Sequence, residues 1–262
     1  MWSRFAIAFA IALAISLTAR RSRALSVAGT AAATAVGTLA LLAGWKWGVL
    51  LLAYFVSSSA LSRLGANLKT SRTARVIEKG GERDAIQVAA NGVVFGLAAA
   101  LAVLVPGHAV SWAALGAGAL AASASDTWGT EIGTLVGGTP RSIIGFAQVP
   151  VGMSGGVTLA GTFAAVAGAV FVALIAAVLG WPARVAFAAF IGGVAGSTID
   201  SLLGATLQTR RRCDRCECET ERVVHDCGTP TRRARGLAWL SNDAVNFVCG
   251  AVGGLLALLI TR

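Results

Sequence analysis

Residues 109–131 of this chain read AVSWAALGAGALAASASDTWGTE. The first part, Ala109–Ser125, is an apolar run of spanning length, and its many small residues favour close packing of helices in lipid. The second part places two carboxylic acids, Asp126 and Glu131, at one end of that run. The stretch therefore predicts a transmembrane helix that ends in a polar site.

The rest of the chain repeats this pattern. Mean hydropathy is +0.73 and only 13% of the 262 residues are charged, which indicates an integral membrane protein. Apolar runs of spanning length cover Phe5–Ala19, Leu25–Gly44, Trp45–Leu61, Ala85–Val105, Ala109–Ser125, Val151–Leu179, Val185–Thr206 and Leu240–Ile260. We predict an all-α polytopic bundle of about eight transmembrane helices, with residues 1–262 forming a single membrane domain.

The basic residues distinguish the two sides of the membrane. Loops after the first, third, fifth and seventh runs hold 3, 6, 1 and 8 of the 22 Lys and Arg residues, while the other side has Arg4, Lys46, Arg184 and Arg262. By the positive-inside rule the basic side is cytoplasmic and both termini lie outside. All twelve acids lie on or near the basic side, so we expect the active site to face the cytoplasm. The membrane that we expect is the prokaryotic plasma membrane.

The net charge of +10 comes from the same basic loops on the cytoplasmic side. Membrane topology and anionic lipid head groups both require basic inner loops, so we expect the bilayer, and no nucleic acid, as the partner of this charge. The oligomeric state cannot be read from these patterns.

Polar residues near the inner ends of four apolar runs form a candidate site. They are Asn91, Asp126, Thr127, Glu131, Ser197, Asp200, Ser201, Gln208, Asn242, Asp243 and Asn246. Each one alone is also explained by a helix cap or an interhelical hydrogen bond. Ionisable groups at membrane depth are costly, however, and several carboxylates in one pocket repel unless a cation joins them. Hard oxygen ligands suit Mg²⁺ bridging to phosphates, so we predict a shared site with Asp126, Glu131, Asp200 and Asp243 as its ligands.

Two features of the inner loops suit an anion. The glycine-rich turn at Ser154, Gly155 and Gly156 opens the sixth run, where free backbone N–H groups of a helix N-terminus can hold a phosphate. Arg141 is the cation nearest to it in sequence, and Lys69 is a further candidate. A plain tight turn explains the glycines equally well, and Lys69 also serves topology.

The cytoplasmic loop 208–236 contains a second candidate centre. Cys213 and Cys216 form a C-x-x-C pair, and His225 and Cys227 follow. A disulfide is not expected in a reducing cytoplasm, and four such ligands suit a small structural zinc site. Free thiols are the alternative, and Cys218 is a rival ligand.

Five motifs in order carry a family resemblance. They are ASDTWGTEIG at 124–133, PRSI at 140–143, VPVGMSGGVT at 149–158, GSTIDSLLGATLQ at 196–208 and NDAVN at 242–246. Together they resemble the membrane family that includes animal transmembrane protein 19 and the phytyl-phosphate kinase of plant plastids. The likeness extends from about Arg83 to the end of the chain.

The resemblance implies an enzyme: a prenyl-phosphate kinase that transfers the terminal phosphoryl group of a nucleoside triphosphate, CTP in the plant enzyme, to a prenyl monophosphate such as phytyl or geranylgeranyl phosphate. On chemical grounds the four acids would hold Mg²⁺, while Asn91, Gln208, Asn242 and Asn246 orient phosphates or the base. Arg141 and the Ser154–Gly156 turn would bind the transferred group. Two alternatives remain: a cytidylyltransferase that forms a CDP-lipid, and a non-enzymatic transporter or flippase of a phosphorylated lipid.

Overall fold

The computed structural model describes residues 2–78 and 81–262. Its long helices are α1 (Trp2–Arg21), α2 (Val27–Ala43), α3 (Trp45–Arg63), α5 (Ala85–Leu104), α6 (Ala109–Val136), α7 (Leu159–Val178), α8 (Ala183–Thr206) and α9 (Asn242–Ile260). A short helix α4 (Ala66–Thr73) and a 3-10 turn η1 (Pro106–His108) lie between them. One long helix falls in each predicted run, which confirms the all-α membrane bundle.

Fewer of the described helices qualify as membrane spans than the eight that we predict. By length and hydropathy, five described helices qualify as spans, and a sixth is added when α3 and α4, bent by 71°, are counted together. Helix α2 has only 17 residues. The prediction of eight spans is therefore approximate.

Two helix ends differ from the predicted runs. Helix α6 continues eleven residues past Ser125 to Val136, so Asp126 and Glu131 lie inside a helix. Helix α7 starts at Leu159, capped by the Thr158 side chain, and not at Val151. Both differences have a local cause: polar residues on α6 continue a helix that packs on α7, whereas the Gly-rich segment before Thr158 forms a turn.

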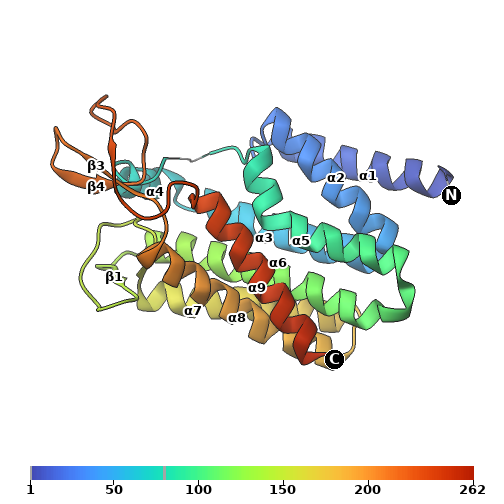
Figure 1. The fold of residues 1–262 in the computed structure, drawn as a ribbon. Coiled ribbons are helices and arrows are strands. Elements are labelled where there is room, and N and C mark those ends of the chain that lie inside the picture. The colour runs from blue at the N-terminus through green and yellow to red at the C-terminus, as the bar shows by residue number, and fades with distance from the viewer. Residues whose placement is uncertain (1, 79–80) are drawn as a thin grey trace.

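The long helices lie side by side, and both chain ends lie at the same end of the bundle (Figure 1). The opposite end carries α4, the strands and the loop 208–236. We call this loop, with its strands β3, β4 and β5, the cap. Both termini are thus on the side away from the cap, as an even number of crossings requires.

Helix α6 forms the centre of the bundle. Its residues from Ala113 to Ser125 are all buried, and it packs against α5, α7, α8 and α9. Helices α8 and α9 approach through glycines, since a Cβ on Gly192 would lie 2.2 Å from the Gly253 carbonyl oxygen. This close packing holds α6, α8 and α9, and therefore their polar ends, at fixed positions.

Five short strands accompany the helices at the cap end. Strands β1 (Arg141–Ser142) and β2 (Gly156–Val157) pair antiparallel. In the cap, β3 (Arg210–Cys213) lies between β4 (Cys218–Thr220) and β5 (Arg232–Arg235), and both pairings are antiparallel. The apolar runs contain no signal for these strands.

Candidate functional site

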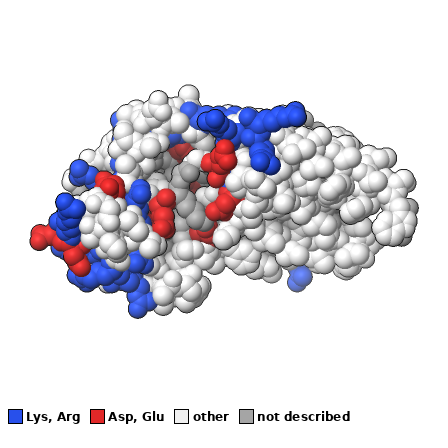
Figure 2. All heavy atoms as spheres, turned by 90° about the horizontal axis from the view of Figure 1, so that it is seen from above, with Lys and Arg blue, Asp and Glu red and all other residues white. Residues whose placement is uncertain are grey.

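A cavity of about 980 Å³ opens at the cap end of the bundle. All but one of the residues predicted to bind Mg²⁺, nucleotide or substrate line it: Lys69, Asn91, Asp126, Thr127, Glu131, Ser154, Gly155, Gly156, Ser197, Asp200, Ser201, Gln208, Asn242, Asp243 and Asn246. On the face drawn in Figure 2, acidic side chains gather near the middle, with basic side chains toward the cap and along one edge. The sequence pattern therefore identified residues that share one space.

The centre of the cavity is a pair of carboxylates. Asp126 of α6 and Asp200 of α8 interact directly with each other. The Oδ2 atom of Asp200 is buried and has no hydrogen-bond partner among the described residues. Two half-buried carboxylates that interact repel each other when both are charged, so the pair is suited to share a cation or a proton.

Glu131, the other acid on α6, has a different environment. Its carboxylate forms an ion pair with the buried Lys69 ammonium and accepts a hydrogen bond from the Ser62 hydroxyl at 2.6 Å. Lys69 also donates to the carbonyls of Leu61 and Ser62 at 2.7 and 2.9 Å. Lys69 thus balances the Glu131 charge and ties the α3–α4 bend to α6, so Asp126 and Asp200 are the stronger candidates for metal ligands.

The polar start of α9 faces the same cavity. Ser241 caps the helix by accepting from the Ala244 N–H at 3.4 Å, and Asn242, Asp243 and Asn246 line the cavity. Asn91 of α5 also lines the cavity, and its amide donates within the helix to the Gln87 carbonyl at 3.0 Å.

The glycine-rich turn is already bound to a carboxylate. The Ser154 N–H donates to Oε1 of Glu221 at 2.8 Å. Gln208 Nε2 donates to the Ser154 hydroxyl at 2.8 Å and to Glu221 Oε2 at 3.2 Å. Gly155, with φ +78°, packs so closely on α8 that a Cβ would lie 2.3 Å from the Ala205 nitrogen. The turn can therefore accept an anion, but in this structure the anion is Glu221.

Two predictions about this loop need correction. The turn was expected at a helix N-terminus, but two residues lie between Gly155 and the Thr158 cap of α7. Arg141 was expected to bind the transferred group, but it does not line the cavity. It is exposed, and its Nη1 donates to the Phe146 carbonyl at 2.9 Å. Pairing of Arg141 with Val157 in the β1–β2 hairpin fixes it there.

Glu221 and Arg83 are two of the cavity residues that were not predicted. Glu221 is the residue that follows β4, and its side chain lines the cavity. Burial raises the pKa of its carboxyl, and hydrogen bonds with Ser154 offset part of this rise. Arg83 points at α3, donating to the hydroxyls of Ser59 and Ser62 at 3.0 and 3.4 Å. In the sequence both residues lie among many loop charges, so nothing distinguished them.

Arginines balance the acids of the cavity. Its lining includes Arg23, Arg63, Arg83, Arg211 and Arg222. A space that offers paired carboxylates together with arginines suits a polyanion accompanied by a divalent cation.

A second, apolar cavity of about 280 Å³ adjoins the first. It lies among α1, α2, α3 and α5 and is lined by apolar side chains that include Trp45, Leu52 and Phe55. Arg83, Gln87 and Asn91 line both cavities. A polar space and an apolar space therefore meet at these three residues.

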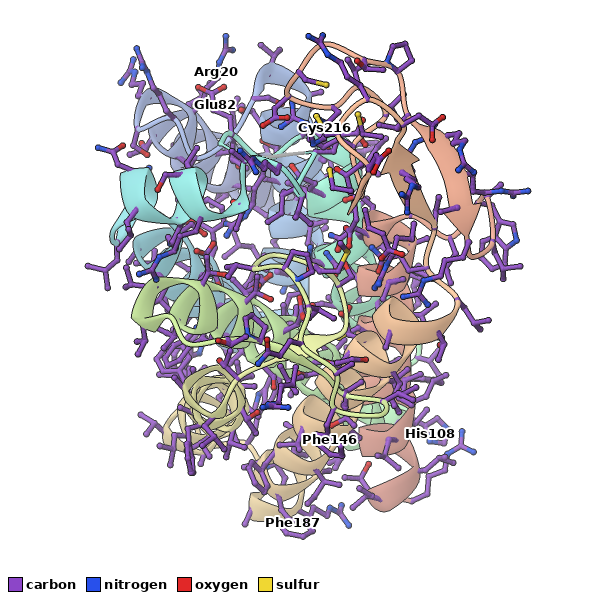
Figure 3. The ribbon with its side chains drawn as sticks, turned by 90° about the vertical axis from the view of Figure 1, so that its left-hand side faces the viewer. Arg20, Glu82, His108, Phe146, Phe187 and Cys216 are labelled. Carbon is purple, nitrogen blue, oxygen red and sulfur yellow. The ribbon has the colours of Figure 1, made fainter. Side chains whose placement is uncertain are left out.

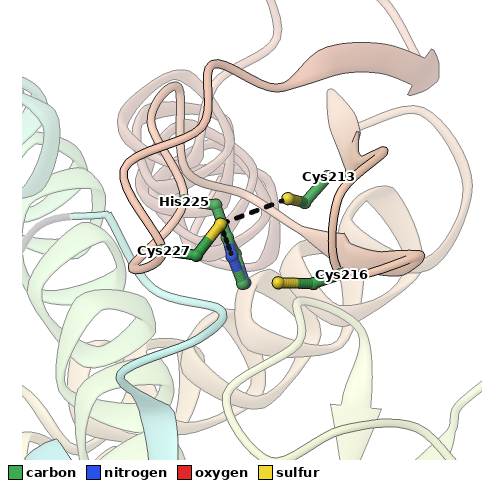
Figure 4. A group of neighbouring side chains, drawn as sticks. All are labelled: Cys213, Cys216, His225 and Cys227. Atoms are coloured by element: carbon green, nitrogen blue, oxygen red, sulfur yellow. Dashed lines mark hydrogen bonds between the residues drawn. The ribbon is translucent and has the colours of Figure 1, made fainter.

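The cap holds the predicted cysteine and histidine group. The ligand atoms of Cys213, Cys216, His225 and Cys227 all lie within 4.8 Å of one another (Figure 4). Cys216 lies within the cap, seen from the cap end of the bundle in Figure 3. The rival Cys218 is not part of this group of four, although its sulfur is 3.5 Å from His225 Nε2.

The fold and the cavity define an integral membrane protein with a polar site at one end of a helix bundle. More specifically, the chain belongs to the family described as integral membrane protein DUF92, whose model matches residues 10–254. This confirms the family resemblance drawn from the motifs.

Three relatives illustrate the breadth of the family. Protein PGR of Arabidopsis thaliana is 32% identical over 237 residues, which cover 81% of each chain. The uncharacterized membrane protein MJ0933 of Methanocaldococcus jannaschii is 30% identical over 85% of this chain and 79% of its own. Protein VTE6, chloroplastic, of Arabidopsis thaliana is 29% identical over 87% of this chain and 62% of its own. No solved structure matches the chain.

Proposed function

We propose that this protein is a membrane-embedded phosphotransferase that moves the terminal phosphoryl group of a nucleoside triphosphate, CTP, to a prenyl monophosphate. The observation that carries the proposal is the Asp126–Asp200 pair, with its unpartnered Asp200 oxygen, in a cavity that adjoins an apolar one. The similarity to the chloroplastic protein VTE6 and the five sequence motifs support the same class of reaction.

The paired carboxylates fit Mg²⁺. Asp126 and Asp200 offer hard oxygen ligands, and the buried Asp200 Oδ2 lacks a partner among the described residues, so a cation would satisfy it. When bound, Mg²⁺ neutralises charge on the phosphates during transfer. Asp243 and the side chains of Asn242 and Asn246 lie in the same cavity and would orient the nucleotide.

The lipid substrate would use both cavities. An isoprenoid tail suits the apolar cavity among α1, α2, α3 and α5, and its phosphate would then lie near Arg83, Gln87 and Asn91 where the cavities meet. The Arg83 guanidinium can bind a phosphate oxygen in two-point contact. The acceptor phosphate is itself the nucleophile, so the reaction needs positioning and charge neutralisation more than a strong base.

The position of the cavity argues against transport. The acidic pair is close to the cap end, whereas transporters bind their substrates near the bilayer midplane with access from both sides. We also propose that the cap end faces the cytoplasm, since most Lys and Arg residues lie at that end.

The test uses the purified protein in lipid nanodiscs with Mg²⁺ and either phytyl or geranylgeranyl monophosphate. CTP or ATP is labelled at the γ or at the α phosphate. Movement of the γ label to the lipid is the expected result. Movement of the α label would indicate a cytidylyltransferase, and a lipid without label from either position would exclude both activities.

A further inference from the structure

We propose that the cap binds one zinc ion through Cys213, Cys216, His225 and Cys227, and that this ion holds Glu221 at the Ser154 turn. The proposal concerns the architecture of the cap and is independent of the phosphotransferase reaction.

The four side chains have the spacing of a tetrahedral site. The sulfur atoms of Cys213 and Cys227 are 3.7 Å apart, and His225 Nδ1 lies 3.3 Å from the Cys227 sulfur. Zinc–sulfur bonds of about 2.3 Å in a tetrahedron place two sulfurs about 3.8 Å apart. A disulfide requires about 2.05 Å between sulfurs, so the group is arranged around a common centre rather than as a covalent bond.

The backbone brings the ligands together by two turns of the same kind. Cys216 is followed by Glu217, which has φ +52°, and Cys227 is followed by Gly228, which has φ +80°. A left-handed residue at each place reverses the chain directly after a cysteine. In the second turn the Gly228 N–H donates to the His225 carbonyl at 2.9 Å. Both pairs of ligands therefore face one point.

The cap has no aliphatic core that could replace a metal. Within residues 208–236, all of which the structure describes, the buried side chains are Gln208, Arg210, Cys213, Thr220, His225 and Thr231. Val223 and Val224 are exposed. Segments of this size need a disulfide, a metal or a partner to be stable, and thiolate and imidazole donors select zinc over Mg²⁺.

Ordering of the cap has a consequence for the cavity because Glu221 directly follows β4. The Thr220 hydroxyl donates to the Arg75 carbonyl at 2.7 Å, and the Glu221 N–H donates to the Val76 carbonyl at 3.0 Å. Arg222 Nη1 donates to the Ala74 carbonyl at 2.9 Å. The metal group at one end of the cap thus fixes the segment that places the Glu221 carboxylate on the Ser154 N–H.

Metal analysis tests the site itself. Protein purified under reducing conditions without chelators should hold about one zinc per chain, and Co²⁺ in its place should give the absorption of a tetrahedral thiolate site. The double variant Cys213→Ser with Cys216→Ser should lose the metal. Cys249→Ser, a matched change of a thiol buried in α9, and Cys218→Ser should keep it.

A folded wild-type protein without zinc would overturn the proposal. Retention of zinc by the double variant, or its loss on Cys218→Ser alone, would overturn the ligand set. Hydrogen exchange then tests the link to the cavity: the double variant should show faster exchange than Cys249→Ser in residues 74–78 and 152–156. Equal exchange in both variants would refute the role assigned to the metal. No measurement here depends on phosphoryl transfer.

Discussion

Asp126 and Asp200 are the Mg²⁺ ligands that we propose, and replacing either of them tests this role. Asn in place of either aspartate keeps its shape and removes one charge. Turnover in the phosphotransferase assay should fall by roughly 10²-fold or more, a loss typical of a missing electrostatic contact at a reacting phosphate or carbonyl. Stability should change little or rise, because the two carboxylates repel each other in the absence of a cation.

Glu82→Gln serves as the matched control, since Glu82 is exposed and does not line the cavity. It should leave turnover and thermal melting unchanged. Near-normal turnover in both aspartate variants would contradict the site, and so would unfolding with unchanged activity per folded molecule.

Glu221 allows a prediction about pH. Burial raises the pKa of its carboxyl, so the folded state binds a proton more tightly than the unfolded chain, whose value is about 4.3. Stability should therefore fall as pH rises from that value through the higher folded pKa. Above this window Glu221→Gln should melt at a higher temperature than wild type, and below it the two proteins should melt alike. Thermal melting across a pH series checks this, and parallel curves at all pH values would contradict it.

At the scale of elements, the α8–α9 contact is sensitive to side-chain volume. A Cβ on Gly192 meets the Gly253 carbonyl at 2.2 Å, so Gly192→Ala forces the two backbones apart. We expect a loss of about 1–3 kcal/mol in unfolding free energy, measured by thermal melting in detergent. Gly107→Ala is the control because its Cβ would meet nothing within 4 Å. Equal melting of the two variants would show that the helices can separate freely.

The helices were predictable and the connections between them were not. Apolar length located every long helix, since burial in lipid imposes one requirement on each span. The beginning of α9 was also close, because the polar motif at residues 241–243 marks it. The start of α7 and the strands of the cap depend on pairing with distant segments, such as Arg141 with Val157, and a run of apolar residues contains no such information.

The site shows the same division. Residues on helices, such as Asp126 and Asp200, could be placed together because carboxylates at the same membrane depth are costly unless they share a cation or a polar cavity. Arg141 does not line the cavity, because its pairing with Val157, and not its closeness in sequence, decides where its side chain lies. Glu221 was missed because the way the cap packs on the bundle brings it to the cavity, and no spacing in the sequence indicates this packing.

At the scale of the molecule, orientation in the membrane is open to direct measurement. Gly107→Cys lies in η1, at the end of the bundle opposite the cap, while Ala234→Cys lies in the exposed strand β5. In intact cells an impermeant maleimide should label the first variant, and the second only after the membrane is permeabilised. The reverse pattern would show that the termini and the cap have exchanged sides.

The meeting of the two cavities at Arg83, Gln87 and Asn91 has a kinetic consequence under the proposed function. One substrate would arrive by diffusion in the plane of the membrane, and the other by diffusion through the aqueous volume. The rate should then follow the mole fraction of prenyl phosphate in the bilayer, and not its amount per litre of sample. Diluting a fixed quantity of substrate with inert phospholipid in proteoliposomes should slow the enzyme, whereas changing the buffer volume at fixed nucleotide concentration should not.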